Sequence, residues 1–149
     1  MNGLRVAAPL AGTVVALEAV PDLVFAQGMV GPGVAIDPAP GEEVTVVSPV
    51  AGTIAALHPH AFAVAAAGGD ILVHLGIDTV TLGGDPFEVL VEADAQVAQG
   101  EAIVRWRLGE IGALSPLVPV VALGKRDVHH LVKAGGHIGV GNGLFHLIA

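Results

Sequence analysis

Apolar residues occupy every second position near the middle of the chain, in the segment 69–80 with the sequence GDILVHLGIDTV. An extended strand places alternate side chains on opposite faces. One face then carries Ile71, Val73, Leu75 and Ile77, and the other carries Leu72, His74, Gly76 and Asp78. The pattern predicts a β-strand with one side in the core and an imidazole and a carboxylate on the other.

A second histidine, His60, lies in the apolar segment 57–64, with the sequence LHPHAFAV. The residues Ala-Gly-Gly-Asp at 67–70 are typical of a turn and separate this segment from the one that holds His74. Two such segments favour a β-hairpin, in which facing side chains on neighbouring strands lie close together. The sequence therefore predicts a site of two histidines, His60 and His74, on a β-sheet.

The chain also contains an internal duplication. Residues 9–17 (PLAGTVVAL) recur as residues 49–57 (PVAGTIAAL), and residues 96–104 resemble residues 137–145. Each copy predicts a turn with glycine followed by a strand. The only candidate helices are short, at 86–90 and 126–133. Frequent Gly and Pro break the chain into short strands, which predicts one domain over residues 1–149: all-β, an antiparallel β-sandwich or barrel with a duplicated β-motif and little helix.

The composition narrows the class of protein. Hydrophobic residues make up 53% of the 149 residues, enough for a substantial core, yet no apolar run approaches the roughly 20 residues of a membrane-spanning helix. Cysteine is absent, which excludes disulfides, thiolate metal sites and a cysteine nucleophile. The first residues do not resemble a signal peptide. We expect a cytoplasmic protein without direct membrane insertion.

The charge balance bears on possible partners. Six basic residues against fourteen acidic ones give a net charge of −8, and the basic residues form no broad stripe. The few aromatic residues are scattered, so nucleic acid is not an expected partner. An acidic chain fits a basic protein partner better, because complementary charges speed encounter.

Five motifs in order along the chain are similar to one known family: APLAG at 8–12, VPDLVFA at 20–26, SPVAGTI at 48–54, HAF at 60–62 and VHLGIDTV at 73–80. The chain resembles the glucose-type enzyme IIA of the bacterial phosphoenolpyruvate-dependent sugar phosphotransferase system. The resemblance implies a flattened antiparallel β-sandwich that relays a phosphoryl group. The donor would be the histidine-containing phosphocarrier protein HPr, and the acceptor a cysteine on the enzyme IIB domain of a membrane sugar permease.

The resemblance also implies the roles of single residues. His74 corresponds to the phosphorylated histidine, His60 to its neighbour, and Asp22 and Asp78 to the flanking carboxylates. Imidazole suits such a relay because its pKa of about 6.5 leaves it mostly neutral near pH 7. The carbonyl of Gly76 is the expected partner of the non-reacting ring nitrogen. We expect His60 to donate a hydrogen bond to the phosphoryl group, and no cofactor or metal ion to be needed.

Donor contact is expected to use the residues around the histidines. The two carboxylates would meet a basic donor, since they would repel a phosphate. An apolar ring around the histidines would complete a transient interface; its expected members are Leu23, Val24, Phe25 and Leu72. The chain departs from many relatives in having His58-Pro59 where they carry a threonine close before the second histidine, and Leu72 where an aromatic residue can occur.

Two other functions fit parts of the pattern. In a zinc-dependent hydrolase, His58, His60 and His74 would supply three nitrogen ligands. No nearby glutamate is an obvious general base, however, and Pro59 disturbs regular strand spacing. Outside that hypothesis, His58 is expected to be an exposed loop histidine. The duplicated strands are also typical of a lipoyl or biotinyl carrier, but the two lysines, Lys125 and Lys133, lie outside any expected hairpin tip.

Overall fold

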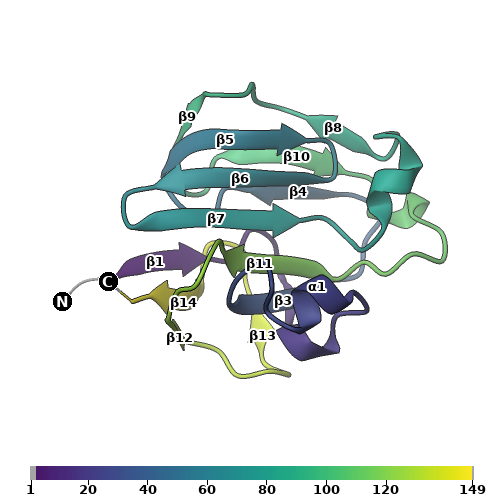
Figure 1. Cartoon of the computed structure of the whole chain (residues 1–149). Coiled ribbons are helices and arrows are strands. Elements are labelled where there is room, and N and C mark those ends of the chain that lie inside the picture. Colours follow the sequence, from purple (N-terminus) through teal and green to yellow (C-terminus); the bar gives the residue numbers. More distant parts are fainter. Residues whose placement is uncertain (1–2, 149) are drawn as a thin grey trace.

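The structure is a computed structural model that describes residues 3–148, and over these residues nearly all regular structure is β-strand (Figure 1). The strands are β1 (Leu4–Ala7), β2 (Gly12–Ala16), β3 (Gly33–Pro38), β4 (Val44–Val47), β5 (Gly52–His58), β6 (Ala61–Ala66), β7 (Gly69–His74), β8 (Phe87–Val89), β9 (Gln96–Val97), β10 (Ala102–Trp106), β11 (Val118–Ala122), β12 (Val128–His130), β13 (His137–Ile138) and β14 (Gly143–Leu147). The helices are single turns: α1 (Leu23–Ala26), η1 (Leu17–Ala19), η2 (Thr79–Leu82) and η3 (Leu108–Glu110).

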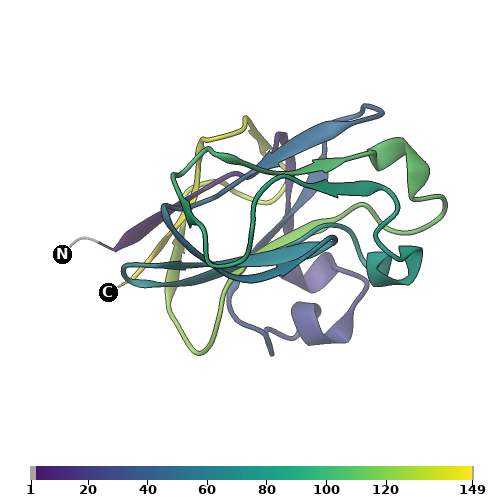
Figure 2. The ribbon, with the colours of Figure 1, turned by 90° about the horizontal axis from the view of Figure 1, so that it is seen from above.

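The strands form three sheets in which all pairings are antiparallel. The largest has the order β13-β2-β3-β11-β7-β6-β5-β9, and the two smaller sheets have the orders β4-β10-β8 and β1-β14-β12. Seen from above, the strands lie in facing layers, with α1 outside them (Figure 2). The expected all-β sandwich with little helix is confirmed.

The duplication seen in the sequence is also a duplication of strand pairing. The first copy supplies β2, which pairs with β13, and the second supplies β5, which pairs with β9. In the same way β1 pairs with β14, and β4 with β10. Each half of the duplication therefore contributes two equivalent antiparallel pairs, which accounts for both sequence echoes.

The repeated glycine of each copy has a steric reason. A Cβ added at Gly12 would lie 2.1 Å from the carbonyl oxygen of Asp37, and one added at Gly52 would lie 2.2 Å from that of Ala65. Real Cβ atoms do not approach oxygen so closely. Glycine is therefore required at both positions so that the neighbouring strand can pair.

The apolar face of the segment 69–80 enters the core as expected, but the strand is shorter than predicted. Ile71, Val73 and Leu75 are fully buried in the main core between the sheets. β7 ends at His74, and Ile77 joins a smaller buried cluster that also contains Phe25. The prediction that one strand continues to Asp78 is therefore wrong, because the chain turns at Gly76, whose φ is +81°.

Both candidate helices are strands in the structure. Within 86–90, residues 87–89 form β8 on the edge of β10; within 126–133, residues 128–130 form β12 on the edge of β14. Segments this short gain little from helical hydrogen bonds alone. Pairing to an open sheet edge satisfies their backbone groups, and Phe87 additionally stacks on Trp106 with ring centroids 5.7 Å apart.

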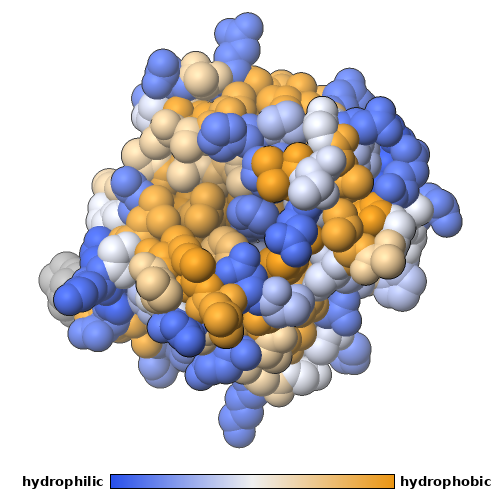
Figure 3. Space-filling view, turned by 45° about the vertical axis from the view of Figure 1, so that its right-hand side comes forward, coloured by the Kyte–Doolittle hydropathy of each residue, from blue (hydrophilic) through white to orange (hydrophobic). Residues whose placement is uncertain are grey.

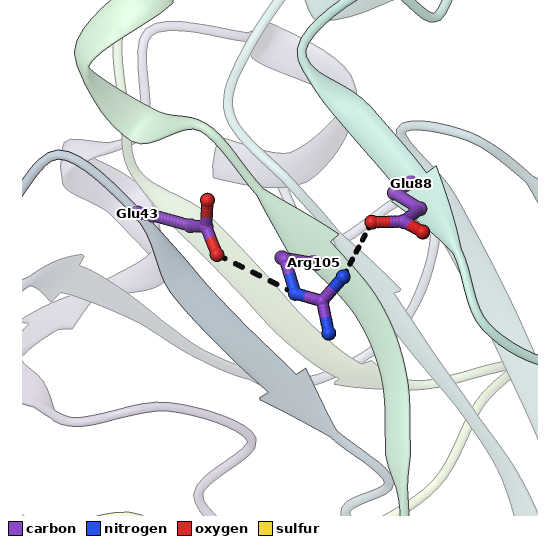
Figure 4. A network of polar contacts seen from close by, with 3 residues as sticks. All are labelled: Glu43, Glu88 and Arg105. Atoms are coloured by element: carbon purple, nitrogen blue, oxygen red, sulfur yellow. Dashed lines mark hydrogen bonds and ion pairs between the residues drawn. The ribbon is translucent and has the colours of Figure 1, made fainter.

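Two of the basic residues are tied to acidic neighbours. Arg105 on β10 lies between Glu43 and Glu88, with N···O distances of 3.4 and 2.5 Å (Figure 4). Arg107 pairs with Glu110 at 2.7 Å. These side chains are partly exposed, so they add little stability. The paired carboxylates do balance the positive charges of Arg105 and Arg107. This agrees with the sequence, in which the basic residues form no broad stripe.

Candidate functional site

The hairpin of β6 and β7 brings the two predicted histidines together. Ala61, the first residue of β6, lies opposite His74, the last residue of β7. His60 immediately precedes Ala61, and its carbonyl accepts a hydrogen bond from the amide of Leu75 at 2.7 Å. The rings of His60 and His74 meet edge to face with centroids 5.1 Å apart. The predicted proximity of these two histidines is confirmed.

The hydrogen bonding of His74 defines which ring nitrogen is free. Nδ1 lies 2.6 Å from the carbonyl oxygen of Gly76. A carbonyl only accepts hydrogen bonds, so Nδ1 carries the proton and donates it. In the neutral ring the lone pair then lies on Nε2. The arrangement presents Nε2 as a nucleophile of fixed orientation.

Gly76 has a backbone shape that few other residues adopt. Its φ of +81° turns the carbonyl back towards His74. A Cβ at this position would lie 2.6 Å from Cγ2 of Thr79 and 3.0 Å from the carbonyl oxygen of Ser115. Both the conformation and the lack of space therefore require glycine.

Phe25 also contacts the ring of His74. The two rings pack edge to face with centroids 5.3 Å apart. Phe25 is only 6% exposed and belongs to the smaller core cluster. The expectation that Phe25 forms part of an exposed docking ring is wrong, because its side chain is used to pack α1 against the sheet beside His74.

Asp22 holds the short helix that carries Phe25. Its Oδ1 accepts hydrogen bonds from the amides of Val24 at 2.9 Å and Phe25 at 3.4 Å, which makes Asp22 the N-cap of α1. Because α1 has only one turn, this cap satisfies a large part of its free backbone donors. The predicted flanking carboxylate is thus also a structural support for the ring contact between Phe25 and His74.

Burial dominates the electrostatics of the two histidines. It lowers the pKa of His74 below 6.5, although the Gly76 hydrogen bond and the negative charges of Asp22 and Asp78 act in the opposite direction. Burial also lowers the pKa of His60, and the positive forms of His74 and His58 lower it further. Both rings are therefore neutral near pH 7, as a nucleophile and its neighbour require.

Asp78 begins the turn that follows the site. It adopts the left-handed conformation, with φ of 63°, and its carbonyl accepts hydrogen bonds from the hydroxyl and amide of Thr81. Its exposed carboxylate makes no capping bond to η2. The side chain is thus directed to solvent near His74, where it raises the pKa of that histidine by its charge.

Several exposed or half-buried apolar side chains lie on the segments that carry the site. Leu23 is 72% exposed and Val24 48% exposed, while Leu72 is half-buried on the strand face that it shares with His74. Val80, which the sequence analysis did not single out, is 60% exposed and lies two residues after Asp78. Its position two residues after a candidate carboxylate was the available signal. Figure 3 shows apolar patches beside polar groups on this side of the molecule.

His58 lies closer to the site than expected of a loop histidine. It ends β5, is exposed, and its ring lies 5.8 Å from that of His60 at an interplanar angle of 34°. The three imidazoles thus form a row with His60 in the middle.

This row is not a metal site of the kind that the zinc hydrolase hypothesis requires. Within residues 3–148, no three or more His, Cys, Asp or Glu side chains are grouped so that they could hold a metal ion. Within the same residues, no helix is long and apolar enough to cross a membrane.

The fold and the site define a class: an antiparallel β-sandwich that presents one oriented imidazole nitrogen at an acidic, apolar-rimmed surface, as a group-transfer protein does. The family model described as "phosphoenolpyruvate-dependent sugar phosphotransferase system, EIIA 1" matches residues 4–128. The chain belongs to this EIIA family and is a phosphotransferase component of the sugar phosphotransferase system. Nothing in these comparisons supports the zinc hydrolase hypothesis.

Individual relatives agree with this assignment. The chain is 43% identical over 123 residues to the glucose-specific EIIA component of Staphylococcus aureus (strain COL), covering 79% of this chain and 72% of that one. It is 45% identical over 139 residues to the N-acetylglucosamine-specific EIICBA component of Escherichia coli (strain K12), covering 89% of this chain but only 21% of that protein. The solved structure of glucose permease IIA from Mycoplasma capricolum matches with a TM-score of 0.85, at 31% identity, and covers 97% of this chain and 96% of that chain.

Proposed function

We propose that His74 is the residue that carries the phosphoryl group. The observation that supports this most directly is the hydrogen bond from Nδ1 to the Gly76 carbonyl, which leaves the Nε2 lone pair free. That lone pair attacks the phosphorus of the donor's phosphohistidine. The donor's N–P bond breaks, and its electron pair returns to the donor imidazole. Positioning and charge stabilisation supply the catalysis, so the step needs no side chain to act as an acid or base on the reacting atoms.

His60 is the proposed stabiliser of the transferred group. Its ring centroid lies 5.1 Å from that of His74, close enough for a hydrogen bond to a group carried on His74. A hydrogen bond from an imidazole N–H to the charged oxygens strengthens as charge develops during transfer. In onward transfer a cysteine thiolate attacks the phosphorus, and Nε2 of His74 leaves with the bonding electron pair.

The proposed donor is HPr, and the proposed acceptor is the enzyme IIB domain of a sugar permease. Leu23, Val24 and Leu72 provide apolar contact area around His74. Asp78 provides negative charge for a basic donor, and Asp22 retains its second carboxylate oxygen for the same purpose, since Oδ1 makes both cap bonds. We propose the cytoplasm as the compartment in which these contacts occur.

We further propose that residues 1–149 form one EIIA domain. The family match ends at residue 128, but β14 lies beyond it and pairs with β1 at the beginning of the described chain. Leu144, Phe145 and Leu147 of β14 are buried in the main core. The residues after 128 are therefore needed to close the sandwich.

The test is incubation with phosphoenolpyruvate, enzyme I and HPr, followed by measurement of the intact mass. We expect one acid-labile, base-stable phosphoryl group on the wild-type chain and none on His74→Gln. His146→Gln, a change at a half-exposed histidine on β14, serves as the matched control and should be phosphorylated normally. A phosphoryl group that persists in His74→Gln would refute the assignment.

His60→Gln separates acceptance from onward transfer. We expect this variant to accept the phosphoryl group from HPr but to pass it more slowly to the enzyme IIB cysteine, because stabilisation along the transfer path is lost. The measurement is the rate of each half-reaction in rapid-quench experiments. Onward transfer at the wild-type rate would show that His60 has only a structural role.

A further inference from the structure

His58 and His74 occupy one row across the sheet. His58 on β5 lies opposite Ala61 on β6, and Ala61 lies opposite His74 on β7. Residues directly opposite each other in a sheet project their side chains to the same face. The two imidazoles therefore stand on either side of Ala61, two strand spacings or about 9.6 Å apart at the backbone. Ala61, whose side chain is a single methyl group, lies between them.

The ring of His60 bridges this gap. Its centroid lies 5.8 Å from that of His58 and 5.1 Å from that of His74. The positive form of His58 already acts on His60, whose pKa it lowers.

Other charged groups lie on the segments next to this row. Asp22 precedes α1 and Asp78 follows β7, and both act on His74 by their charge. The loop before β8 contains Asp85, and a Cβ at Gly84 of this loop would lie 3.2 Å from Cγ of Pro59. Arg107 reaches the same loop by donating to the carbonyl of Asp85. Of the three imidazoles in the row, His58 is exposed, whereas His60 and His74 are half-buried.

We propose that His58 takes up a proton from solvent when His74 is phosphorylated, so that the row of imidazoles neutralises part of the charge of the phosphoryl group. This inference rests on the proposed function of His74. The step adds one proton to the neutral imidazole of His58 and changes no other bond there. The proton leaves again to solvent when the phosphoryl group is passed on.

The physical cause is the charge that arrives at His74. A phosphoryl group carries roughly −1.5 to −2 charges near neutral pH. A nearby negative charge favours the protonated form of an imidazole. The interaction crosses a partly wet surface, so it is screened to a large extent. Imidazole is the side chain whose charge state responds most readily to its surroundings near neutral pH.

The consequence is a phosphotransfer equilibrium that depends on pH through His58. Acid favours the phosphorylated chain, because the phosphorylated form binds more protons than the free form. Removal of the His58 imidazole should weaken this dependence. A residue that only docks the donor changes the rate of transfer but leaves the equilibrium constant unchanged. The equilibrium constant therefore separates proton uptake from docking.

The experiment measures the equilibrium constant between phosphorylated HPr and this chain at about pH 6 and about pH 8. We compare the wild type with His58→Gln, and use His129→Gln, an exposed histidine on β12, as the matched control. The ratio of variant to wild type cancels the pH dependence of the donor. The equilibrium constant for phosphorylation of the wild type should increase from the higher to the lower pH. For His58→Gln we expect this increase to be smaller by a factor of about two to five. His129→Gln should behave as the wild type.

A second measurement observes the proton directly. The side-chain nitrogen resonances of His58, recorded by NMR near pH 7 before and after phosphorylation, should move towards the protonated form, and those of His129 should not. Unmoved His58 resonances in a protein that carries phosphate on His74 would overturn this inference and leave the proposed function standing. Failure of His74 to accept phosphate at all would overturn both.

Discussion

The role of Asp22 leads to a prediction that separates two effects of one carboxylate. Its Oδ1 lies 2.9 Å from the amide of Val24, within the normal range, and 3.4 Å from that of Phe25, at the long limit. The structure therefore shows about one good capping bond, and loss of an N-cap costs about 1 kcal/mol. For a chain of this size, the expected decrease in melting temperature for Asp22→Ala is about 2–4 °C.

Asp22→Asn is the matched variant, because asparagine caps a helix as well as aspartate does but carries no charge. We expect its melting temperature to stay close to that of the wild type. Both variants remove the charge that faces a basic donor, so both should accept phosphate more slowly at low salt. At high salt the charge effect is screened. Only Asp22→Ala should then remain slow, by about fivefold if the lost 1 kcal/mol of ordering is felt at His74.

The assays are thermal unfolding and the rate of phosphoryl transfer from HPr at two salt concentrations. Equal melting temperatures for the two variants would show that Asp22 does not stabilise α1. Equal rates at high salt, together with a lower melting temperature for Asp22→Ala, would show that the cap matters for stability but not for the orientation of Phe25 and His74. Either result would contradict the proposed double role of Asp22 as cap of α1 and support of the His74 site.

Three further predictions concern the same site. Because burial lowers the pKa of His74, its neutral form, which is the nucleophile, predominates above pH 6.5. In a pH–rate profile, the transfer rate should be constant above that pH. It should fall only at a pH more acidic than the pKa of free imidazole. Phe25→Ser should destabilise the fold by about 3–5 kcal/mol in chemical denaturation. Leu23→Ser, at an exposed residue, should leave the stability unchanged and weaken donor binding in a titration. Equal stabilities of the two variants would place Phe25 outside the core. Gly76→Ala should lower the melting temperature and the rate of acceptance together, since both its φ of +81° and the Thr79 contact oppose a Cβ; a fully active variant would contradict the proposed role of the Gly76 carbonyl.

The sequence predicted the hairpin of His60 and His74 because both signals are local. Alternation specified which face of β7 is buried, and the glycines at 68 and 69 specified the turn. The duplicated segments likewise predicted equivalent strands, and the required closeness of Gly12 and Gly52 to neighbouring carbonyls explains why the glycines recur. The family motifs added the assignment of roles, which alternation and turn residues do not contain.

The sequence was misleading where the structure of a segment depends on contacts with distant parts of the chain. Segments 86–90 and 126–133 form strands because β10 and β14 have open edges with which they pair. A short local sequence pattern carries no information about such edges. Phe25 has an apolar side chain in a loop bounded by prolines, which suits either a docking surface or a core. Its burial was decided by Ile77 and Val121, residues far along the chain that form its cluster.

The sequence by itself therefore determined the strand faces, the turns and the closeness of two imidazoles, because these follow from side-chain periodicity and backbone preference over a few residues. Only the tertiary structure decided that β7 stops at His74, that the Gly76 carbonyl selects Nε2 as the free nitrogen, and that His58 completes the row of imidazoles. These features depend on the angle of one turn and on register across three strands. Both are set by packing between segments that no local pattern relates.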